Sequence, residues 1–343
     1  SLQRCIQKGK DLIGWKEHFP RVQISKTIVR GYGMAVTMQG SGIAKIDSAS
    51  VIIKLNEDGF FTLSHSASDM GQGSDTVLTQ IAAEILEVDL GQINVCSFDL
   101  DTLPYDPGAY ASSGVYVTGN AAWRAADDMK RQMRRSAAQL LHVNPDDISY
   151  SNGVFSTPDK RTLTLSELAK ALCSFAGRDQ LTAKGTFGGE TSPPPFIAGF
   201  AEVEVDIETG VSKVTNYAAV ADCGTVINRN LARIQVESGV VMGIGFGLYE
   251  EVRYSGSGRL ATSSFMEYKI PSREDIGTIA VAFESSYEPT GPFGAKSIGE
   301  VVCNTPAPAI AHAIHNATGT YFRTLPITAE KILFAKIQEN GPE

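Results

Sequence analysis

The chain has 343 residues, of which 43% are hydrophobic and 20% are charged, and this composition excludes disordered and collagen-like proteins. At ~150 residues per domain, the length predicts about two domains or one large one. Lysine and arginine number 30 against 38 acidic residues, and the net charge of −8 gives no overall attraction to nucleic acid or anionic lipid.

Targeting and redox features are also informative. We find neither an apolar run long enough to span a membrane nor a signal peptide at the start, so we expect a cytoplasmic protein with no membrane or nucleic-acid partner. The five cysteines are odd in number and far apart, and no CxxC occurs. We therefore expect reduced thiols, with neither a disulfide framework nor a zinc site.

The first half of the chain predicts hairpins, helices and one long loop. Gly59 marks the turn of the first hairpin, and the loop, which has no periodicity, is of the kind that is usually functional. The expected elements are a helix over 1–19, a strand over 24–38, a hairpin over 51–68, a helix over 76–86, a strand over 92–98, the loop over 99–114 and helices over 119–142 and 166–175.

The second half of the chain also predicts a hairpin, helices and a strand. Gly210 marks the turn of a second hairpin, and Pro306 stands early in a helix, where proline is favoured. The expected elements are a hairpin over 196–224, a helix over 230–248, a strand over 278–284 and helices over 305–317 and 327–337.

Hairpins interleaved with long helices predict an α+β fold with mostly antiparallel strands. The run SPPP at 192–195 is the best candidate for a boundary. We therefore expect two similar subdomains of antiparallel strands and long helices, over residues 1–192 and 193–343.

Glycine is over-represented, at 33 of 343 residues against a usual ~7%. The glycines gather in separate loops, which indicates tight turns or a backbone that approaches a large ligand closely. The first such loop, Ser68–Thr76, contains Gly71, Gln72 and Gly73 before a predicted helix, whose first N–H groups suit an anionic ligand. An ordinary glycine connection with Ser74 or Asp75 as helix cap explains the same residues.

Two further loops are candidates for ligand contact. Small and hydroxyl residues, among them Ala111, Ser112 and Ser113, precede the helix expected at 119, although a capped turn accounts for them equally. In the run GPFGAKSIGE, Glu300 follows a glycine turn and precedes Val301. We expect its carboxylate to be desolvated, the condition that makes it a usable base, and the alternative is a surface glutamate after a turn.

Other patterns are interpreted structurally. The run GIGFG at 243–247 lacks the preceding strand of a dinucleotide site, so we interpret its glycines as close helix packing. His312 and His315 share a helix face, but we find no third ligand and predict no metal site on protein side chains.

Four of these runs occur together in one order: DMGQGSDTVLTQIAAEIL, PYDPGAYASSGVYVTGNAA, DCGTVINRNLARIQVESGVVMGIGFGLYEE and GAKSIGE. In this order they resemble the molybdenum hydroxylases. From about Thr27 to Leu333 the chain is similar to the C-terminal part of the molybdopterin-binding region of xanthine dehydrogenases and aldehyde oxidases. Where the animal enzymes carry a ring-stacking phenylalanine, this chain has Gly40-Ser41-Gly42, which favours the bacterial type.

The resemblance implies roles for individual residues. Glu300 matches the catalytic glutamate, which in that family is the base that activates oxygen derived from water. The matching cofactor-binding positions are Gly71, Gln72, Gly73, Ala111, Ser112, Ser113, Gln235 and Lys296. The metal itself is held by the pterin in that family, so the resemblance assigns no metal ligand to this chain.

The resemblance also implies an oxidoreductase that hydroxylates an N-heteroaromatic substrate, such as the purines xanthine and hypoxanthine. Oxidation of an aldehyde or nicotinate is one alternative, and a non-catalytic glycine-rich ligand-binding domain is another. The cofactor is the molybdenum–pterin group, with its cytosine dinucleotide form left open. The expected partners are the first half of the molybdopterin region and the 2Fe–2S and FAD modules, on the same polypeptide or on other subunits, and we expect the chain alone to be inactive.

Overall fold

The computed structural model describes residues 1–174 and 180–339, which form two compact units. Unit 1 comprises residues 1–39, 194–286 and 298–343, and unit 2 comprises residues 40–193 and 287–297. One crossing between the units lies at 193–194, and the expected division of the chain at 192–193 stays a prediction. The other crossings assign residues 1–39 to the unit built from the second half, and residues 287–297 to the unit built from the first.

Unit 1 is built on a five-stranded sheet in the order β1-β2-β10-β11-β12. β11 and β12 pair in parallel and the other neighbours are antiparallel. Alternate residues of β10 enter two different hydrophobic clusters, which shows that both faces of the sheet are covered. The strands are β1 (Arg21–Gln23), β2 (Ile28–Met38), β10 (Phe196–Asp206), β11 (Ser212–Asp222) and β12 (Thr278–Phe283).

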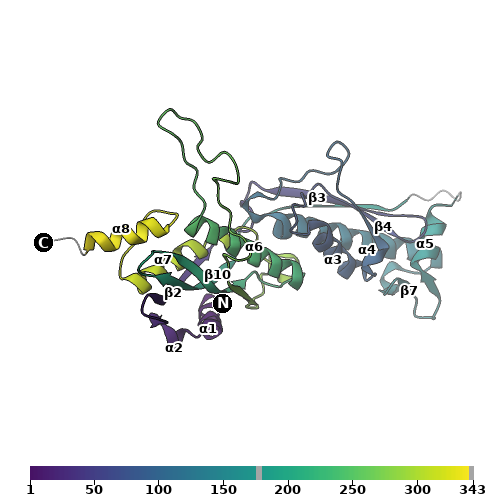
Figure 1. The fold of residues 1–343 in the computed structure, drawn as a ribbon. Coiled ribbons are helices and arrows are strands. Elements are labelled where there is room, and N and C mark those ends of the chain that lie inside the picture. The colour runs from purple at the N-terminus through teal and green to yellow at the C-terminus, as the bar shows by residue number, and fades with distance from the viewer. Residues whose placement is uncertain (175–179, 340–343) are drawn as a thin grey trace. The chain divides into compact units, whose positions relative to one another are not determined.

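Helices cover the two faces of this sheet (Figure 1). α7 (Pro306–Thr318) packs on β2 and β10, and α6 (Arg229–Leu248) packs on α7, whereas α1 (Leu2–Ile13) lies on the opposite face against β10 and β11. Short α2 (Trp15–His18) follows α1, and α8 (Ala329–Glu339) ends the described chain.

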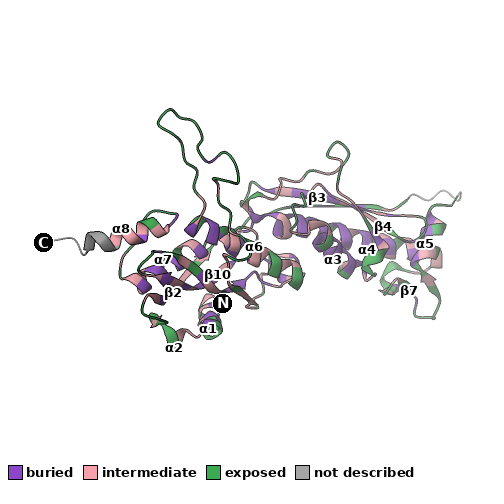
Figure 2. Cartoon of the chain, in the orientation of Figure 1, coloured by how far each residue is buried: buried purple, intermediate pink, exposed green. Residues whose placement is uncertain are grey.

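Unit 2 repeats this plan with a four-stranded sheet in the order β5-β4-β3-β9. α4 (Gly119–Leu141) packs on β9 and β3, and α3 (Ser74–Leu86) packs on α4. The strands are β3 (Ser48–Leu55), β4 (Phe61–Ser64), β5 (Ile93–Cys96) and β9 (Thr182–Gly188). The buried faces of α3 and α4 appear in purple in Figure 2.

The helices approach the sheets closely because glycines occupy the contact points. A Cβ added to Gly33 of β2 would lie 2.2 Å from the Ala309 carbonyl oxygen of α7. A Cβ added to Gly185 of β9 would lie 2.1 Å from the Ala121 carbonyl oxygen of α4. The same contact in both units agrees with the expectation of two similar α+β subdomains.

The structure confirms the expected helices and the two long hairpins, with shifted ends. Neither β9 nor a small sheet of three-residue strands was expected from the sequence; those strands are β6 (Ser149–Ser151), β7 (Val154–Ser156) and β8 (Thr162–Thr164). The helix expected over 166–175 is α5 (Leu165–Leu172), and Phe175 lies outside the described residues.

The expectation that no segment spans a membrane bears on one helix, α6. By length and composition, α6 is apolar enough to cross a membrane. A core helix passes the same test, and Val236, Val240 and Ile244 of α6 are fully buried in the core of unit 1. This packing accounts for the apolar character of the helix.

The close contact between α7 and β2 yields a stability test. We expect Gly33→Ala to lower the free energy of unfolding by about 1–3 kcal/mol, because the added methyl group meets backbone atoms that cannot move independently. Gly256→Ala is the matched control, since a Cβ there meets nothing within 4 Å. Urea unfolding of the two variants should separate them, and equal midpoints would contradict the account.

Candidate functional site

The loop between β4 and α3 is organised by the side chain of Gln72. Its Oε1 accepts a hydrogen bond from the Met70 N–H at 2.6 Å, and its Nε2 donates to the Ser68 carbonyl at 2.7 Å and to Ser74 Oγ at 2.8 Å. Gly71 and Gly73 on either side have φ angles of 105° and 80°, a conformation that favours glycine. The loop is therefore held in one shape by its own residues.

Asp69 completes this internal bonding. Its Oδ1 accepts hydrogen bonds from the N–H groups of Gly71 at 2.9 Å and Gly73 at 3.2 Å. Burial alone would raise the pKa of Asp69, but these backbone donors outweigh it and lower the pKa below its usual value. We expected these N–H groups to serve a ligand, whereas in the structure they bind this carboxylate.

Gln72 lines an open pocket within unit 2 whose empty volume, including its mouth, is about 420 Å³. Small residues leave this space, and the wall is mainly apolar, with Ser68, Ser74 and Asp106 adding few polar atoms. The remaining lining residues are Ala67, Val77, Leu78, Gly108, Ala109, Gly114 and Val115. The pocket thus joins the Gln72 loop to the second expected motif.

That second motif has an unusual backbone. Ala111 and Ser112 are consecutive non-glycine residues with φ angles of 50° and 55°. Ser112 is buried, and Ser113 is fully buried and donates to the Gly108 carbonyl at 2.8 Å. Strained conformations of this kind concentrate at functional sites. A single π-helical turn, Gly114–Thr118, then leads into α4.

Lys296 and the segment around Ser41 are buried in unit 2. The Ser41 Oγ donates to the Pro193 carbonyl at 2.6 Å and lies 2.9 Å from the Ser297 Oγ. This hydroxyl network joins residue 41, from the glycine-rich 40–42 segment, to the residue after Lys296.

Unit 1 brings together Gln235 and Glu300. Gln235, on α6, donates its Nε2 proton to the carbonyl of Gly299 at 3.1 Å, and Gly299 directly precedes the glutamate. The Gln39 Nε2 donates to the Glu300 carboxylate, so one side chain holds the backbone and another the acid. The expectation that Glu300 is desolvated is wrong for this chain, because its side chain is exposed.

The expected site residues thus form two groups in different units. Gln72, Ala111, Ser112, Ser113 and Lys296 belong to unit 2, and Gln235 and Glu300 belong to unit 1. That both groups serve one cofactor, as the resemblance implies, remains a prediction.

The glycines at 243–247 and the histidines His312 and His315 make structural contacts. A Cβ on Gly243 of α6 would lie 2.6 Å from Pro306 of α7, which confirms close helix packing. His312 accepts from the Met34 N–H at 3.2 Å, and His315 stacks on Tyr321 with ring centres 3.7 Å apart. Across residues 1–174 and 180–339, no group of three or more His, Cys, Asp or Glu is placed to hold a metal ion.

Sequence analysis missed Gln39, Asp69 and Asp106. Asp69 carried a usable signal, since an aspartate two residues before a glycine forms Asx-type turns. Gln39 carried none, because 261 residues separate it from Glu300.

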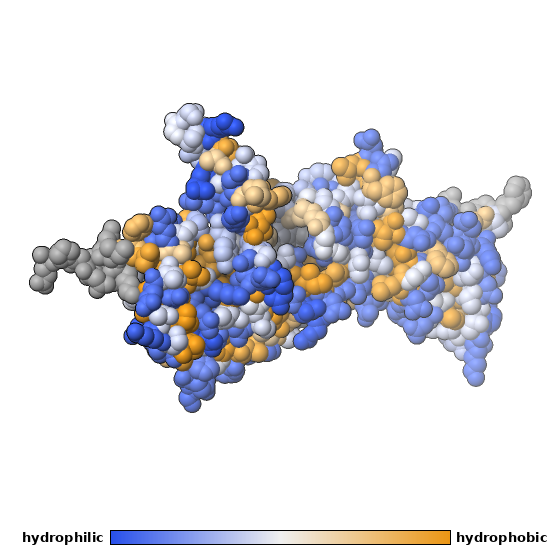
Figure 3. All heavy atoms as spheres, viewed as in Figure 1, coloured by the Kyte–Doolittle hydropathy of each residue, from blue (hydrophilic) through white to orange (hydrophobic). Residues whose placement is uncertain are grey.

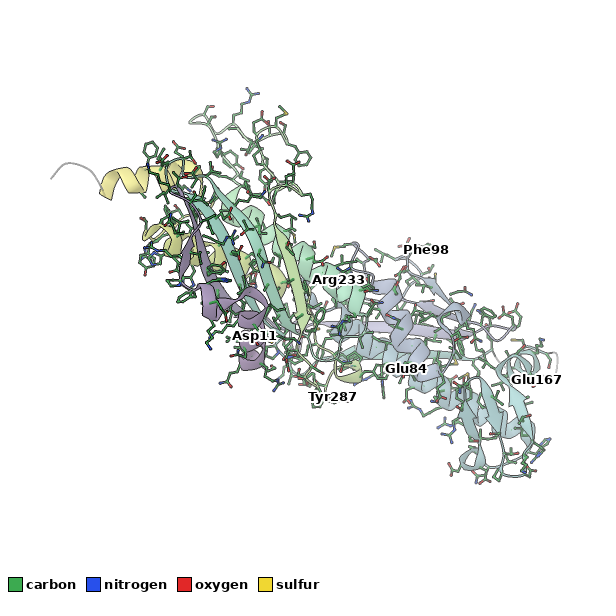
Figure 4. The ribbon with its side chains drawn as sticks, turned by 60° about the horizontal axis from the view of Figure 1, so that its bottom comes forward. Asp11, Glu84, Phe98, Glu167, Arg233 and Tyr287 are labelled. Atoms are coloured by element: carbon green, nitrogen blue, oxygen red, sulfur yellow. The ribbon has the colours of Figure 1, made fainter. Side chains whose placement is uncertain are left out.

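The long connections carry exposed apolar side chains. Phe98, labelled in Figure 4, is 85% exposed in unit 2, whereas Glu84 and Arg233 mark exposed positions of α3 and α6. In unit 1 the connection from α6 to β12 exposes Phe265 and Met266, and Figure 3 shows hydrophobic residues in orange along that connection. We assign these exposed apolar side chains no role in the site.

Comparison with known proteins identifies the class. The family model of the molybdopterin cofactor-binding domain matches residues 8–277. The chain therefore belongs to the molybdopterin cofactor-binding domain family, and its cofactor is the molybdenum–pterin group, as the four ordered motifs predicted.

Individual relatives share most of this chain. It is 35% identical over 339 residues to "Probable hypoxanthine oxidase XdhD" of Escherichia coli K12, covering 98% of this chain and 35% of that protein. It is 30% identical over 343 residues to "Aldehyde oxidoreductase molybdenum-binding subunit PaoC" of the same organism, covering 97% and 44%. The structure of quinoline 2-oxidoreductase from Pseudomonas putida 86 matches with a TM-score of 0.89 at 26% identity, covering 99% and 46%. The chain thus spans less than half the length of these relatives.

The Asp69 bonds predict how the loop responds to acid. Because the pKa of Asp69 is lower in the folded loop than in an unfolded chain, its stabilising effect is complete above the ordinary value near ~3.9. The effect is lost as pH falls through the lowered value. We expect Asp69→Ala to reduce amide-exchange protection of Gly71 and Gly73 at pH 7. Asp58→Ala, in the β3–β4 turn, is the control, and unchanged protection in Asp69→Ala would refute the assignment.

Proposed function

We propose that this chain supplies the base and part of the cofactor-binding wall of a molybdenum hydroxylase that oxidises an N-heteroaromatic compound, a purine such as hypoxanthine being favoured. The observation that carries the catalytic part is the arrangement around Glu300. A glutamine from β2's end holds its carboxylate, and Gln235 holds the peptide immediately before it. An exposed surface glutamate after a turn would need neither partner.

The residues of unit 2 support the binding of a heterocyclic cofactor. The Gln72 pocket has a mainly apolar wall of small residues that leaves room for a ring, with few polar atoms at its edge, and a Cβ on Gly71 would meet nothing within 4 Å. We assign Gly71, Gln72, Gly73, Ala111, Ser112, Ser113, Gln235 and Lys296 to cofactor binding. When bound, the molybdenum–pterin group supplies the two-electron chemistry that protein side chains lack.

In this proposal one residue of the chain accepts a proton, and two others hold that residue in place. Glu300 accepts the proton from the oxygen nucleophile, which derives from water, and Gln39 fixes the direction from which the carboxylate acts. Gln235 holds the peptide before Glu300, which restricts where the carboxylate can lie.

The substrate class follows from the relatives. Two of them are named for hypoxanthine and quinoline, both N-heteroaromatic compounds with electron-poor carbons. Aldehyde oxidation is the second candidate, because the molybdenum-binding subunit of an aldehyde oxidoreductase matches over nearly the whole chain. Turnover of a purine but not of an aromatic aldehyde by the purified complete enzyme would decide between them.

We further propose that the rest of the enzyme provides the first half of the molybdopterin region and the 2Fe–2S and FAD modules, in the cytoplasm. The relatives are roughly two to three times longer than this chain, and one is named as a subunit. These modules accept the electrons that substrate oxidation releases.

The first functional test is Glu300→Gln in the complete enzyme. The amide keeps the shape but cannot accept the proton, so we expect kcat to fall by about 10²–10⁴-fold with molybdenum content unchanged. Glu274→Gln, an exposed change elsewhere in unit 1, is the matched control. Near-normal turnover of Glu300→Gln would remove this residue from the mechanism and favour a non-catalytic ligand-binding domain.

A second test concerns Gln39. Gln39→Leu removes the donor to Glu300, and a hydrogen bond to a charged group contributes about 1.5–3 kcal/mol. We therefore expect kcat to fall about tenfold or more while KM and molybdenum content stay near the wild-type values. Gln7→Leu on α1, which also loses a glutamine–carboxylate bond, controls for the loss of such a bond at the surface. A change confined to KM would show that Gln39 contacts substrate instead.

A further inference from the structure

A buried histidine lies beneath the Gln72 loop and takes no part in the function proposed above. His65 directly follows β4 and is fully buried, and its backbone N–H donates to the Cys96 carbonyl at 3.2 Å. Within the described chain, neither ring nitrogen has a hydrogen bond of good geometry. Buried polar atoms are nearly always satisfied, so this exception calls for a physical explanation.

The nearest charged group explains it. Asp75 is the second residue of α3, and its Oδ1 lies 3.4 Å from the His65 Nε2. That oxygen is also buried without a hydrogen bond, whereas the Oδ2 accepts from Ser97 at 3.1 Å. Two unsatisfied atoms of complementary kind thus face each other, slightly beyond the usual N–H···O range of 2.7–3.2 Å.

The position of this pair gives it a role. His65 lies at the start of the segment that leads to the Gln72 loop, and Asp75 lies just after it. Ser74, next to Asp75, accepts from Gln72 and donates to the Ser68 carbonyl at 2.9 Å. A contact between residues 65 and 75 therefore closes the loop at its base.

We propose that His65 and Asp75 are a positioning pair, in which the neutral imidazole donates to the carboxylate, closes the base of the Gln72 loop and makes its order sensitive to mild acid. The part concerning the cofactor rests on the proposed function, whereas the part concerning loop order does not.

The acid sensitivity follows from burial. Burial lowers the pKa of His65, and the facing carboxylates of Asp75, Asp106 and Asp69 only partly oppose this. A protonated ring would carry a buried charge and a second N–H, at Nδ1, without an acceptor. Protonation therefore favours an opened loop in which the ring reaches water.

The direction of the pH dependence follows from the pKa of His65 in the closed loop and in the opened loop. In the opened loop His65 has its ordinary pKa near ~6.5, and in the closed loop the pKa is lower. Below about pH 6.5 the opened state binds the proton first, so the opening equilibrium rises by up to about tenfold per pH unit until the closed-state pKa is reached. Asp69 does not contribute in this range, because its own effect is lost only at lower pH.

Hydrogen exchange on the full chain tests this without any cofactor. Protection factors for residues 65–75 would be measured at pH 7, 6 and 5, with the β10–β11 hairpin of unit 1 as the internal reference. We expect protection in the wild type to fall severalfold across this range, and His65→Phe to abolish the pH dependence. His142→Asn, at the other described histidine of unit 2, should behave as the wild type.

Two further measurements keep the proposal falsifiable if His65→Phe does not fold. Asp75→Asn should lower protection at pH 7 and shift the titration of the His65 ring further down, as followed by ring ¹⁵N NMR. A wild-type loop whose protection is flat from pH 7 to 5, or a His65 ring that titrates at or above its ordinary pKa, would overturn the proposal.

The link to the cofactor has its own readout. In the complete enzyme, molybdenum retained after incubation at pH 5 should be lower for the wild type than for His65→Phe, measured by metal analysis. If the wild type and His65→Phe retain equal molybdenum while the hydrogen-exchange result is confirmed, only the link to the cofactor is overturned. Failure of the Glu300 test would instead count against the proposed function.

Discussion

Direct contact between helix backbone and strand backbone is the constraint on which both units depend. α7 meets β2 at Gly33 and α4 meets β9 at Gly185, and a single Cβ at either place would collide with main-chain atoms of the helix. A helix seated this closely cannot slide or rotate without losing the fit, so its first turn occupies a fixed position. The segments that lead into these helices are the candidate functional segments: Glu300 precedes α7, and residues 111–118 precede α4.

The loop before α3, the helix that packs on α4, is also held in order, in this case by polar side chains. Gln72 makes three hydrogen bonds inside its own loop, and Asp69 binds two of the loop's N–H groups. Such a loop presents its remaining polar atoms in a set geometry, which lowers the entropic cost of binding a ligand. A short glycine loop ordered in this way would suit the cofactor-binding role proposed for it.

Periodicity and turn chemistry predicted most of the fold, for reasons visible in particular elements. α4 and the β10–β11 hairpin are long and strongly patterned, so their existence could be predicted from local sequence. Strands of three residues, such as β7, are too short to show a period. The Gln39–Glu300 contact and the exposure of Glu300 could not be predicted, because both depend on how distant segments meet. The assignment of residues 1–39 to unit 1 has the same cause: β2 pairs with β10, more than 150 residues later.

The exposure of Glu300 sets a physical requirement for its chemistry. A carboxylate in water is well solvated, and its hydration must be replaced before it can act as an efficient base. Gln39 supplies one directed donor, and such a preorganised donor, unlike water, does not have to reorganise during the reaction. The remaining hydration has to be displaced by cofactor, substrate and neighbouring protein. In the proposed function, the strength of Glu300 as a base therefore depends on assembly of the complete site, whereas Gln39 and Gln235 already restrict where its carboxylate lies.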